Sequence, residues 1–299
     1  MITASSSGFV TFDGTASWFN TAAELGIVAT PVALLLISGE FDLSIGATVG
    51  AASMIVAVGS GTYGLPQWVS IALAVTFSLL VGFVNGFAVT RTKLPSFIVT
   101  LGSQLVIGGA ALGFARALAG TTAVSLVAEP STQAVFGSKI GPFQSTFIWW
   151  IALTLLAAWL LTRTRFGNWI YAAGGSLEVS REAGVPITRV KITLFMATSL
   201  GAALVGIMQT IAFNGGDVTR GRSFIFDAVI AAVIGGVLLQ GGYGSMVGVF
   251  LGVATYGIVN IGIFYTGWNT DYAQLFLGGL LLIAVIANNY FRKLALTSR

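Results

Sequence analysis

Long uncharged apolar stretches, separated by short polar ones, dominate this sequence of 299 residues. An α-helix crosses a hydrocarbon layer of about 30 Å in about 20 residues, and most of the stretches are that long. Their residues do not alternate as barrel strands do, so we expect helices, which pair every backbone polar group internally. The sequence therefore predicts an all-α, polytopic transmembrane helix bundle in a single domain, 1–299. The expected helices are 22–38, 43–59, 67–90, 95–118, 146–162, 192–213, 227–240, 244–266 and 271–290, with 227–240 a half-span or a tilted helix.

Composition excludes several classes of protein. Only 8% of the residues are charged, against roughly 25% in soluble domains. The chain has no histidine and no cysteine, which removes disulfides, imidazole or thiolate metal sites, and Ser/His or Cys/His catalysis. We therefore expect no catalytic residue and no metal site. The net charge of +4 is small, and we expect lipid rather than nucleic acid as the surrounding partner.

The basic residues indicate an orientation. Ten of the fourteen lie in three segments that fall on one side when the nine expected helices alternate. Cytoplasmic segments of membrane proteins are rich in Lys and Arg, so this side is predicted to be cytoplasmic and the C-terminus with it. The N-terminus is then predicted to lie outside. The ten residues are Arg91, Lys93, Arg163, Arg165, Arg181, Arg189, Lys191, Arg292, Lys293 and Arg299.

The loop 163–191 contains seven of the 24 charged residues. A helix Leu177–Ala183 is expected in it, capped by Ser176, with Glu178 at its positive end and Gly184 at a left-handed terminus. Leu177, Val179 and Ala183 would be available for burial. The loop is either an amphipathic connector on the lipid surface or a docking element for a cytoplasmic partner.

Polar residues in or beside the apolar stretches have two interpretations each. Asp42 and Asp227 precede expected helices and are predicted as N-caps or gates. Glu40 and Glu24 lie within or beside apolar runs, where ionisable groups are costly and often functional, and Glu40 is predicted, like the two aspartates, as a helix cap or gate. Five amides inside spans either bond neighbouring helices or line a pathway: Asn85, Gln104, Gln209, Asn260 and Gln274.

A membrane protein of this kind is expected to carry a solute across the membrane, and if that transport is active, the driving energy is expected to come from another subunit. The chain has no G-x-x-x-x-G-K-[ST] sequence, so it lacks the loop that cradles nucleotide phosphates. Ion-driven carriers usually have buried carboxylates or unwound helices near mid-membrane. Here the acidic residues lie at span ends, with Glu24 the exception. A separate driving subunit would attach at 163–191.

Several motifs, in this order along the chain, resemble those of one family. Ser38 to Gly46 resembles the G-x-D-L-S-x-G motif of permease subunits of simple-sugar ABC importers, the ribose/xylose/galactose type. The resemblance covers nearly the whole chain. It continues through Val84-Asn85-Gly86, Pro95 to Gly102, Arg165-Phe166-Gly167, Tyr171 to Gly175, Ala183-Gly184-Val185, Phe226-Asp227-Ala228, Gly241 to Ser245 and Asn260-Ile261-Gly262.

The resemblance implies a permease that imports a monosaccharide or similar small polar solute across the bacterial inner membrane. It implies three partners: a second permease copy or paralogue, a cytoplasmic ATPase that binds ATP and Mg²⁺, and a periplasmic or lipid-anchored solute-binding protein. The docking element on the ATPase would be Leu177, Glu178, Arg181, Glu182, Ala183 and Gly184. The alternatives are a branched-chain amino acid permease of the same superfamily and an ion-coupled secondary carrier.

The chain departs from the family pattern in three respects. The family usually has ten spans with both termini inside, and its first span lies before the point at which this chain begins. We therefore expect an upstream apolar segment in the native gene product, or inefficient insertion of the chain as written. The family also commonly has Gly where Glu40 stands and an acidic residue where Phe226 stands.

Overall fold

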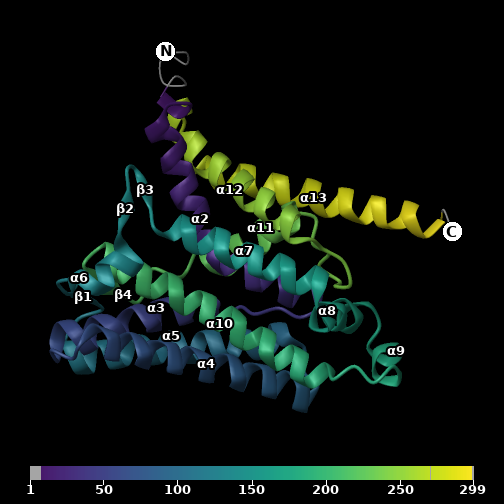
Figure 1. Ribbon diagram of the computed structural model, residues 1–299, viewed down its shortest axis with the longest axis horizontal. Coiled ribbons are helices and arrows are strands. Elements are labelled where there is room, and N and C mark those ends of the chain that lie inside the picture. Colours follow the sequence, from purple (N-terminus) through teal and green to yellow (C-terminus); the bar gives the residue numbers. More distant parts are fainter. Residues whose placement is uncertain (1–7, 270, 298–299) are drawn as a thin grey trace.

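The computed structural model describes residues 8–269 and 271–297, and most of these residues are helical (Figure 1). Within these ranges, eight helices are long and apolar enough to cross a membrane, which confirms the predicted helical bundle. They are α2 (Phe12–Ile37), α3 (Ile45–Val56) with its π-helical extension η1 (Ala57–Thr62), α4 (Gln67–Thr92), α5 (Ser96–Ala119), α7 (Thr146–Arg163), α10 (Ile187–Ala212), α12 (Met246–Thr266) and α13 (Tyr272–Thr297).

Most of the shorter elements lie at the two ends of this bundle, whereas α11 lies within it beside α2 and α12. The strands are at one end, and α8 and α9 are at the other, on the right of Figure 1, where α13 also ends. We call this second end the basic end, because Arg163, Arg165 and Arg181 lie there. The short elements are β1 (Ala123–Ser125), α6 (Pro130–Thr132), η2 (Gln133–Gly137), β2 (Lys139–Ile140), β3 (Phe143–Gln144), α8 (Arg165–Gly175), α9 (Leu177–Glu182), β4 (Gly215–Asp217) and α11 (Phe224–Ile234). Two antiparallel pairs form, β1 with β4 and β2 with β3.

Two helices begin earlier than predicted. The first starts at Phe12 rather than at residue 22, because the Thr11 hydroxyl caps it by accepting a hydrogen bond from the backbone N–H of Gly14 (3.1 Å). The sixth long helix, α10, starts at Ile187 rather than at 192, directly after Pro186. In both helices the first turns are polar and precede the apolar stretch, so the apolar stretch alone places the start too late. The polar sequence from Met1 to Asp13 predicts a short tail; its residues 1–7 lie outside the described residues, and Phe12 and Asp13 already belong to α2.

The central helix of the bundle is α10, which packs against α2, α3 and α4 (Figure 1). Its small residues allow close approach, as is common between helices in membranes. At Gly206 an added Cβ would lie 2.4 Å from the carbonyl oxygen of Val49 on α3. By contrast α5 is the least covered of the long helices, with 6% of its membrane-spanning residues buried against 67% for α10.

The short helix α11 covers only part of a crossing. Its eleven residues extend about 16 Å at 1.5 Å per residue, about half of the hydrocarbon layer. The predicted helix 227–240 is therefore wrong in its bounds, and its half-span interpretation agrees with the structure. After Gly235 the chain continues without helix to the basic end, where the backbone N–H of Gly242 donates to the carbonyl of Ile37 (2.8 Å).

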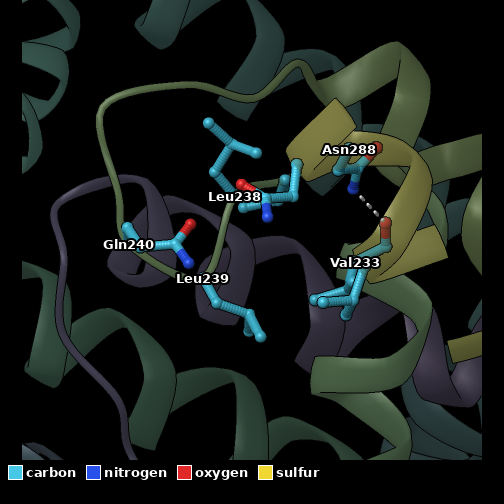
Figure 2. A pocket seen from close by; sticks show the side chains of 8 residues that line it. Val233, Leu238, Leu239, Gln240 and Asn288 are labelled. Atoms are coloured by element: carbon cyan, nitrogen blue, oxygen red, sulfur yellow. Dashed lines mark hydrogen bonds between the residues drawn. The ribbon is translucent and has the colours of Figure 1, made fainter. Parts of the chain in front are cut away.

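Figure 2 shows a side-chain hydrogen bond at the buried C-terminal end of α11. The side-chain amide of Asn288 on α13 donates to the carbonyl of Val233 (3.2 Å) beside a cavity of about 60 Å³. Leu238 and Gln240 of the non-helical segment border the same cavity. Non-helical backbone is tolerated at membrane depth where protein surrounds it, as here.

Candidate translocation pathway and coupling surface

Asp42 lies at the centre of a buried hydrogen-bond network. It belongs to the connection 38–44 between α2 and α3, and only 2% of it is exposed. Its carboxylate accepts hydrogen bonds from the backbone N–H (2.9 Å) and the hydroxyl (2.6 Å) of Ser44, and from the hydroxyl of Thr198 on α10 (2.5 Å). A buried carboxylate is costly without such donors. The bonds therefore tie this connection to the central helix.

The same network extends into α4 and α5. The amide of Asn85 donates to the Ser44 hydroxyl (2.9 Å) and accepts from the Ser103 hydroxyl (2.5 Å). Of these residues, the sequence singled out only Asp42 and Asn85. The two-residue spacing of Asp42 and Ser44 is typical of an Asx turn and could have indicated that pair. Thr198 and Ser103 have no local signal, because only the fold brings them there.

Both predicted aspartate N-caps are wrong in position. The helix after Asp42 begins at Ile45 with Ser44 as its N-cap residue. Asp227 lies inside the first turn of α11, whose N-cap residue is Ser223. Each carboxylate instead bonds residues around the helix start. Asp227 is hydrogen-bonded to Ser223 and to Tyr256 on α12, so it joins two helices.

The five amides predicted for a pathway do not form one lining. Asn85 belongs to the Asp42 network. Nearby, the side-chain oxygen of Gln104 accepts from the backbone N–H of Ala47 at the start of α3 (2.9 Å). Gln209 lies elsewhere, where its amide donates to the Glu24 carboxylate (2.7 Å).

The remaining two amides lie in the C-terminal part of the chain. Asn260 is hydrogen-bonded to Tyr256, the tyrosine that also bonds Asp227. Gln274 lies on the exposed surface of α13. Helix-to-helix bonding therefore describes Asn85 and Gln209 in this structure, and the pathway role of all five residues stays a prediction.

A groove of about 280 Å³ lies on α5, and we call it the α5 groove. One side is formed by the start of α3 and the other by α5, with the loop before α11 closing it. Its polar groups are the Gln104 amide and the Arg222 guanidinium. The lining residues are Gly46, Ala47, Gln104, Leu105, Gly108, Gly109, Leu112, Val218 and Arg222.

In the loop 213–223, which lies beside this groove, two charged side chains hydrogen-bond to nearby residues. Arg220 donates to the carbonyl oxygens of Gln209 on α10 (3.2 Å) and of Gly215 at the start of β4 (2.6 Å). Asp217 accepts from the backbone N–H (2.6 Å) and hydroxyl (2.7 Å) of Thr219. Partial burial raises the pKa of Asp217, but the Thr219 hydrogen bonds and the neighbouring arginines outweigh it and hold the pKa below its ordinary value.

At the basic end, the short helix expected in the loop 163–191 is present. It is α9, Leu177–Glu182, with Ala183 as its C-cap. Gly184 follows at φ +77°, the left-handed terminus that was predicted. Ser176 stands at the N-cap position, but its side chain makes no capping hydrogen bond, so the predicted role of its hydroxyl is wrong. A separate helix, α8, precedes α9 and was not predicted.

The residues buried by α9 also differ from the prediction. Ser180 is buried, because its hydroxyl donates to the carbonyl of Ala172 on α8 (2.6 Å). Leu177 and Val179 are exposed instead, at 43% and 64%. Glu178, Arg181, Glu182 and Ala183 are exposed as well. The helix thus presents an apolar and charged surface away from the bundle.

Three contacts connect the loop to the bundle. Lys191 forms an ion pair with Glu40. The glutamate that stands where the family commonly has glycine therefore has a basic partner. The hydroxyl of Tyr171 on α8 donates to the carbonyl of Gly244 (2.7 Å). Gly174 lies so close to α2 that an added Cβ would be 1.9 Å from the carbonyl oxygen of Ile37. The other departure, Phe226, is 63% exposed on α11.

Comparison with known proteins identifies the family of this chain. The model of the family described as "Branched-chain amino acid transport system / permease component" matches residues 14–285. The chain belongs to this family of transport permeases. It is 31% identical to the fructose import permease protein FrcC of Rhizobium meliloti, over 91% of this chain and 77% of that protein.

Other relatives are similar over comparable lengths. The chain is 29% identical to the ribose import permease protein RbsC of Escherichia coli (strain K12), over 88% of this chain and 81% of that protein. It is also 29% identical to the galactose/methyl galactoside import permease protein MglC of Haemophilus influenzae, over 87% and 81%. Among solved structures, PsaBC from Streptococcus pneumoniae in complex with Fab has a similar fold (TM-score 0.50, 18% identity, 95% of both chains).

Proposed function

We propose that this chain is the membrane-spanning subunit of an ATP-driven importer that moves a monosaccharide into a bacterial cell. The observation that supports this most is the set of relatives named as fructose, ribose and galactose import permeases, which match 87–91% of the chain. The family description names branched-chain amino acids. The relatives favour a sugar, as does the Asp42-Leu43-Ser44 sequence.

The basic end is the cytoplasmic side in this proposal, with the C-terminus there and the protein in the inner membrane. The exposed surface of α9 docks on a separate ATPase, which binds the ATP and Mg²⁺. When the ATPase closes, it displaces α9. The displacement passes to the connection 38–44 through the Lys191–Glu40 ion pair, and from there to α4, α5 and α10 through the Asp42 network.

A second permease copy or paralogue covers α5. Glycines on its open face, such as Gly109 and Gly113, have no other heavy atom within 4 Å of an added Cβ. Small residues on an uncovered membrane helix favour packing against another helix. The α5 groove would then lie at the interface and provide Gln104 and Arg222 to the sugar. A periplasmic or lipid-anchored binding protein delivers the sugar at the end with the strands.

Uptake in proteoliposomes tests the function. The chain is reconstituted with the ATPase and the binding protein of its importer, and uptake of radiolabelled fructose, ribose, galactose and leucine is measured with and without ATP. We expect ATP-dependent uptake of one sugar and no uptake by the permease alone. ATP-dependent uptake of leucine only would support the amino acid permease, and uptake by the permease alone would support a carrier.

A further inference from the structure

A second polar cavity lies on the side of α10 away from the α5 groove, and we call it the outer cavity. It has a volume of about 330 Å³ and shares no lining residue with the groove. It lies between α2, the start of α7, the end of α10 and the segment 133–146, at the end opposite the basic end. The lining residues that matter here are Glu24, Gln133, Phe136, Lys139, Ser145 and Thr146.

Three buried oxygen atoms of this lining have no hydrogen-bond partner among the described residues. They are Oε1 of Gln133, Oγ of Ser145 and Oγ1 of Thr146. Ser145 and Thr146 are each only 4% exposed. Buried polar atoms are nearly always paired, and each unpaired one costs about 1–3 kcal/mol. Their gathering around one cavity indicates a polar occupant.

The size of the cavity argues against a directly coordinated metal ion. Oxygen ligands surround a bound cation at about 2.0–2.6 Å, a far smaller space. The lining includes one acidic and one basic residue, Glu24 and Lys139, so it has no excess of either charge to favour an ionic solute. Small-molecule sites begin at about 300 Å³ and combine apolar walls with a few polar groups.

We propose that the outer cavity binds one neutral polyhydroxylated solute of monosaccharide size. Hydroxyl groups of the solute would donate to Glu24 and Gln133 and exchange hydrogen bonds with Ser145 and Thr146. The ring of Phe136 provides an apolar wall for the C–H face of a sugar. The site lies within one subunit. It rests on the proposed function only for the identity of the sugar, since the imported sugar is the solute expected to fill it.

Two substitutions separate binding from folding. Thr146→Val replaces an unpaired buried hydroxyl by a methyl group of similar size. Ser145→Ala removes a hydroxyl that does not cap α7. Neither change removes a hydrogen bond within the protein, so we expect thermal unfolding in the absence of sugar to be unchanged or at a higher temperature. The matched control is Thr76→Val on the exposed surface of α4, whose hydroxyl bonds only its own helix.

Equilibrium dialysis provides the test. The full chain, purified in lipid nanodiscs without ATPase or binding protein, is dialysed against radiolabelled fructose, ribose or galactose. Sugar concentrations extend to roughly 10 mM, so that a weak site with a Kd of about 1 mM would still be filled. We expect saturable binding of one sugar per subunit. Thr146→Val and Ser145→Ala should each weaken it roughly fivefold, the effect of one hydrogen bond, while Thr76→Val leaves it unchanged.

Two results would overturn the inference. Absence of saturable binding to the unchanged chain means that the cavity holds water only. Binding that both variants retain at full strength places the sugar elsewhere. Neither result bears on the proposed function, which ATP-dependent uptake by the complete importer measures separately. Loss of uptake with dialysis binding intact would sink the proposed function and leave the outer cavity as a sugar site.

Discussion

Removing the Asp42 carboxylate is expected to destabilise the protein more than any other single change in the network. In Asp42→Ala, the backbone N–H and the hydroxyl of Ser44 both lose their acceptor in a buried place. Thr198 keeps an acceptor, because its hydroxyl also bonds the carbonyl of Phe195 (2.8 Å). Two unpaired buried donors at about 1–3 kcal/mol each give a loss of about 2–6 kcal/mol.

Asp42→Asn is expected to cost only about 1 kcal/mol. Its side-chain oxygen can still accept both bonds from Ser44. The Thr198 hydroxyl can turn to Phe195 and accept from the new amide. What is lost is the extra strength of a hydrogen bond to a charged acceptor, which is of that size. Transport should therefore survive in Asp42→Asn and fail in Asp42→Ala.

The assay is reversible denaturation in mixed detergent micelles, followed by circular dichroism, with ATP-driven uptake measured in parallel. Asp217→Ala is a matched control, because Asp217 accepts the same pair of bonds from Thr219 where Thr219 is exposed to solvent. Water replaces the lost acceptor there, so we expect less than about 1 kcal/mol. The reasoning is refuted if Asp42→Ala is no worse than Asp217→Ala. If Asp42→Asn abolishes uptake in a stable protein, the charge itself acts in transport.

Two further predictions concern the basic end. Gly174→Ala should destabilise the protein by about 1–3 kcal/mol, because the added Cβ would overlap the carbonyl of Ile37. Gly175→Ala is the control and should be neutral, because no other atom lies near its added Cβ. Equal melting temperatures of the two variants would contradict the close approach of Gly174 to α2. Lys191→Met should leave the Glu40 carboxylate without its partner at a cost of about 1–3 kcal/mol, most of it recovered by adding Glu40→Gln. A double-mutant cycle on melting curves measures the coupling, and strictly additive effects would argue against the ion pair.

The spans could be predicted from the sequence because lipid leaves so few backbone solutions. The predicted helix ends were less accurate where a helix extends beyond its apolar stretch. The helix α2 extends about three turns before the apolar run, since the Thr11 hydroxyl caps it at a polar position that hydropathy does not mark. The strands β1 and β4 were missed, because three-residue strands paired across 90 residues have no local pattern.

The site was predictable only in its local part. Gly184 and the short helix before it follow from capping rules, which act over a few residues. Which face of α9 would be buried does not follow, because the hydrogen bond from Ser180 to α8 decides it. In the same way, the amide of Gln209 gave no indication that it would pair with Glu24 rather than line a pathway.

The central claim, that α9 couples ATP hydrolysis in a partner to inward movement of a sugar, is tested most directly by the ratio of sugar imported to ATP hydrolysed. The ratio is measured in proteoliposomes for the unchanged chain, for Glu182→Arg and for Ala183→Asp, with Asp271→Arg at the opposite end as the control. Like charges brought together at an interface cost several kcal/mol of binding free energy. Each 1.4 kcal/mol lowers the binding constant tenfold. We expect the ratio to fall at least about tenfold in both α9 variants, with the proteins folded and inserted, and to stay unchanged in the control. An unchanged ratio in both α9 variants would contradict the account.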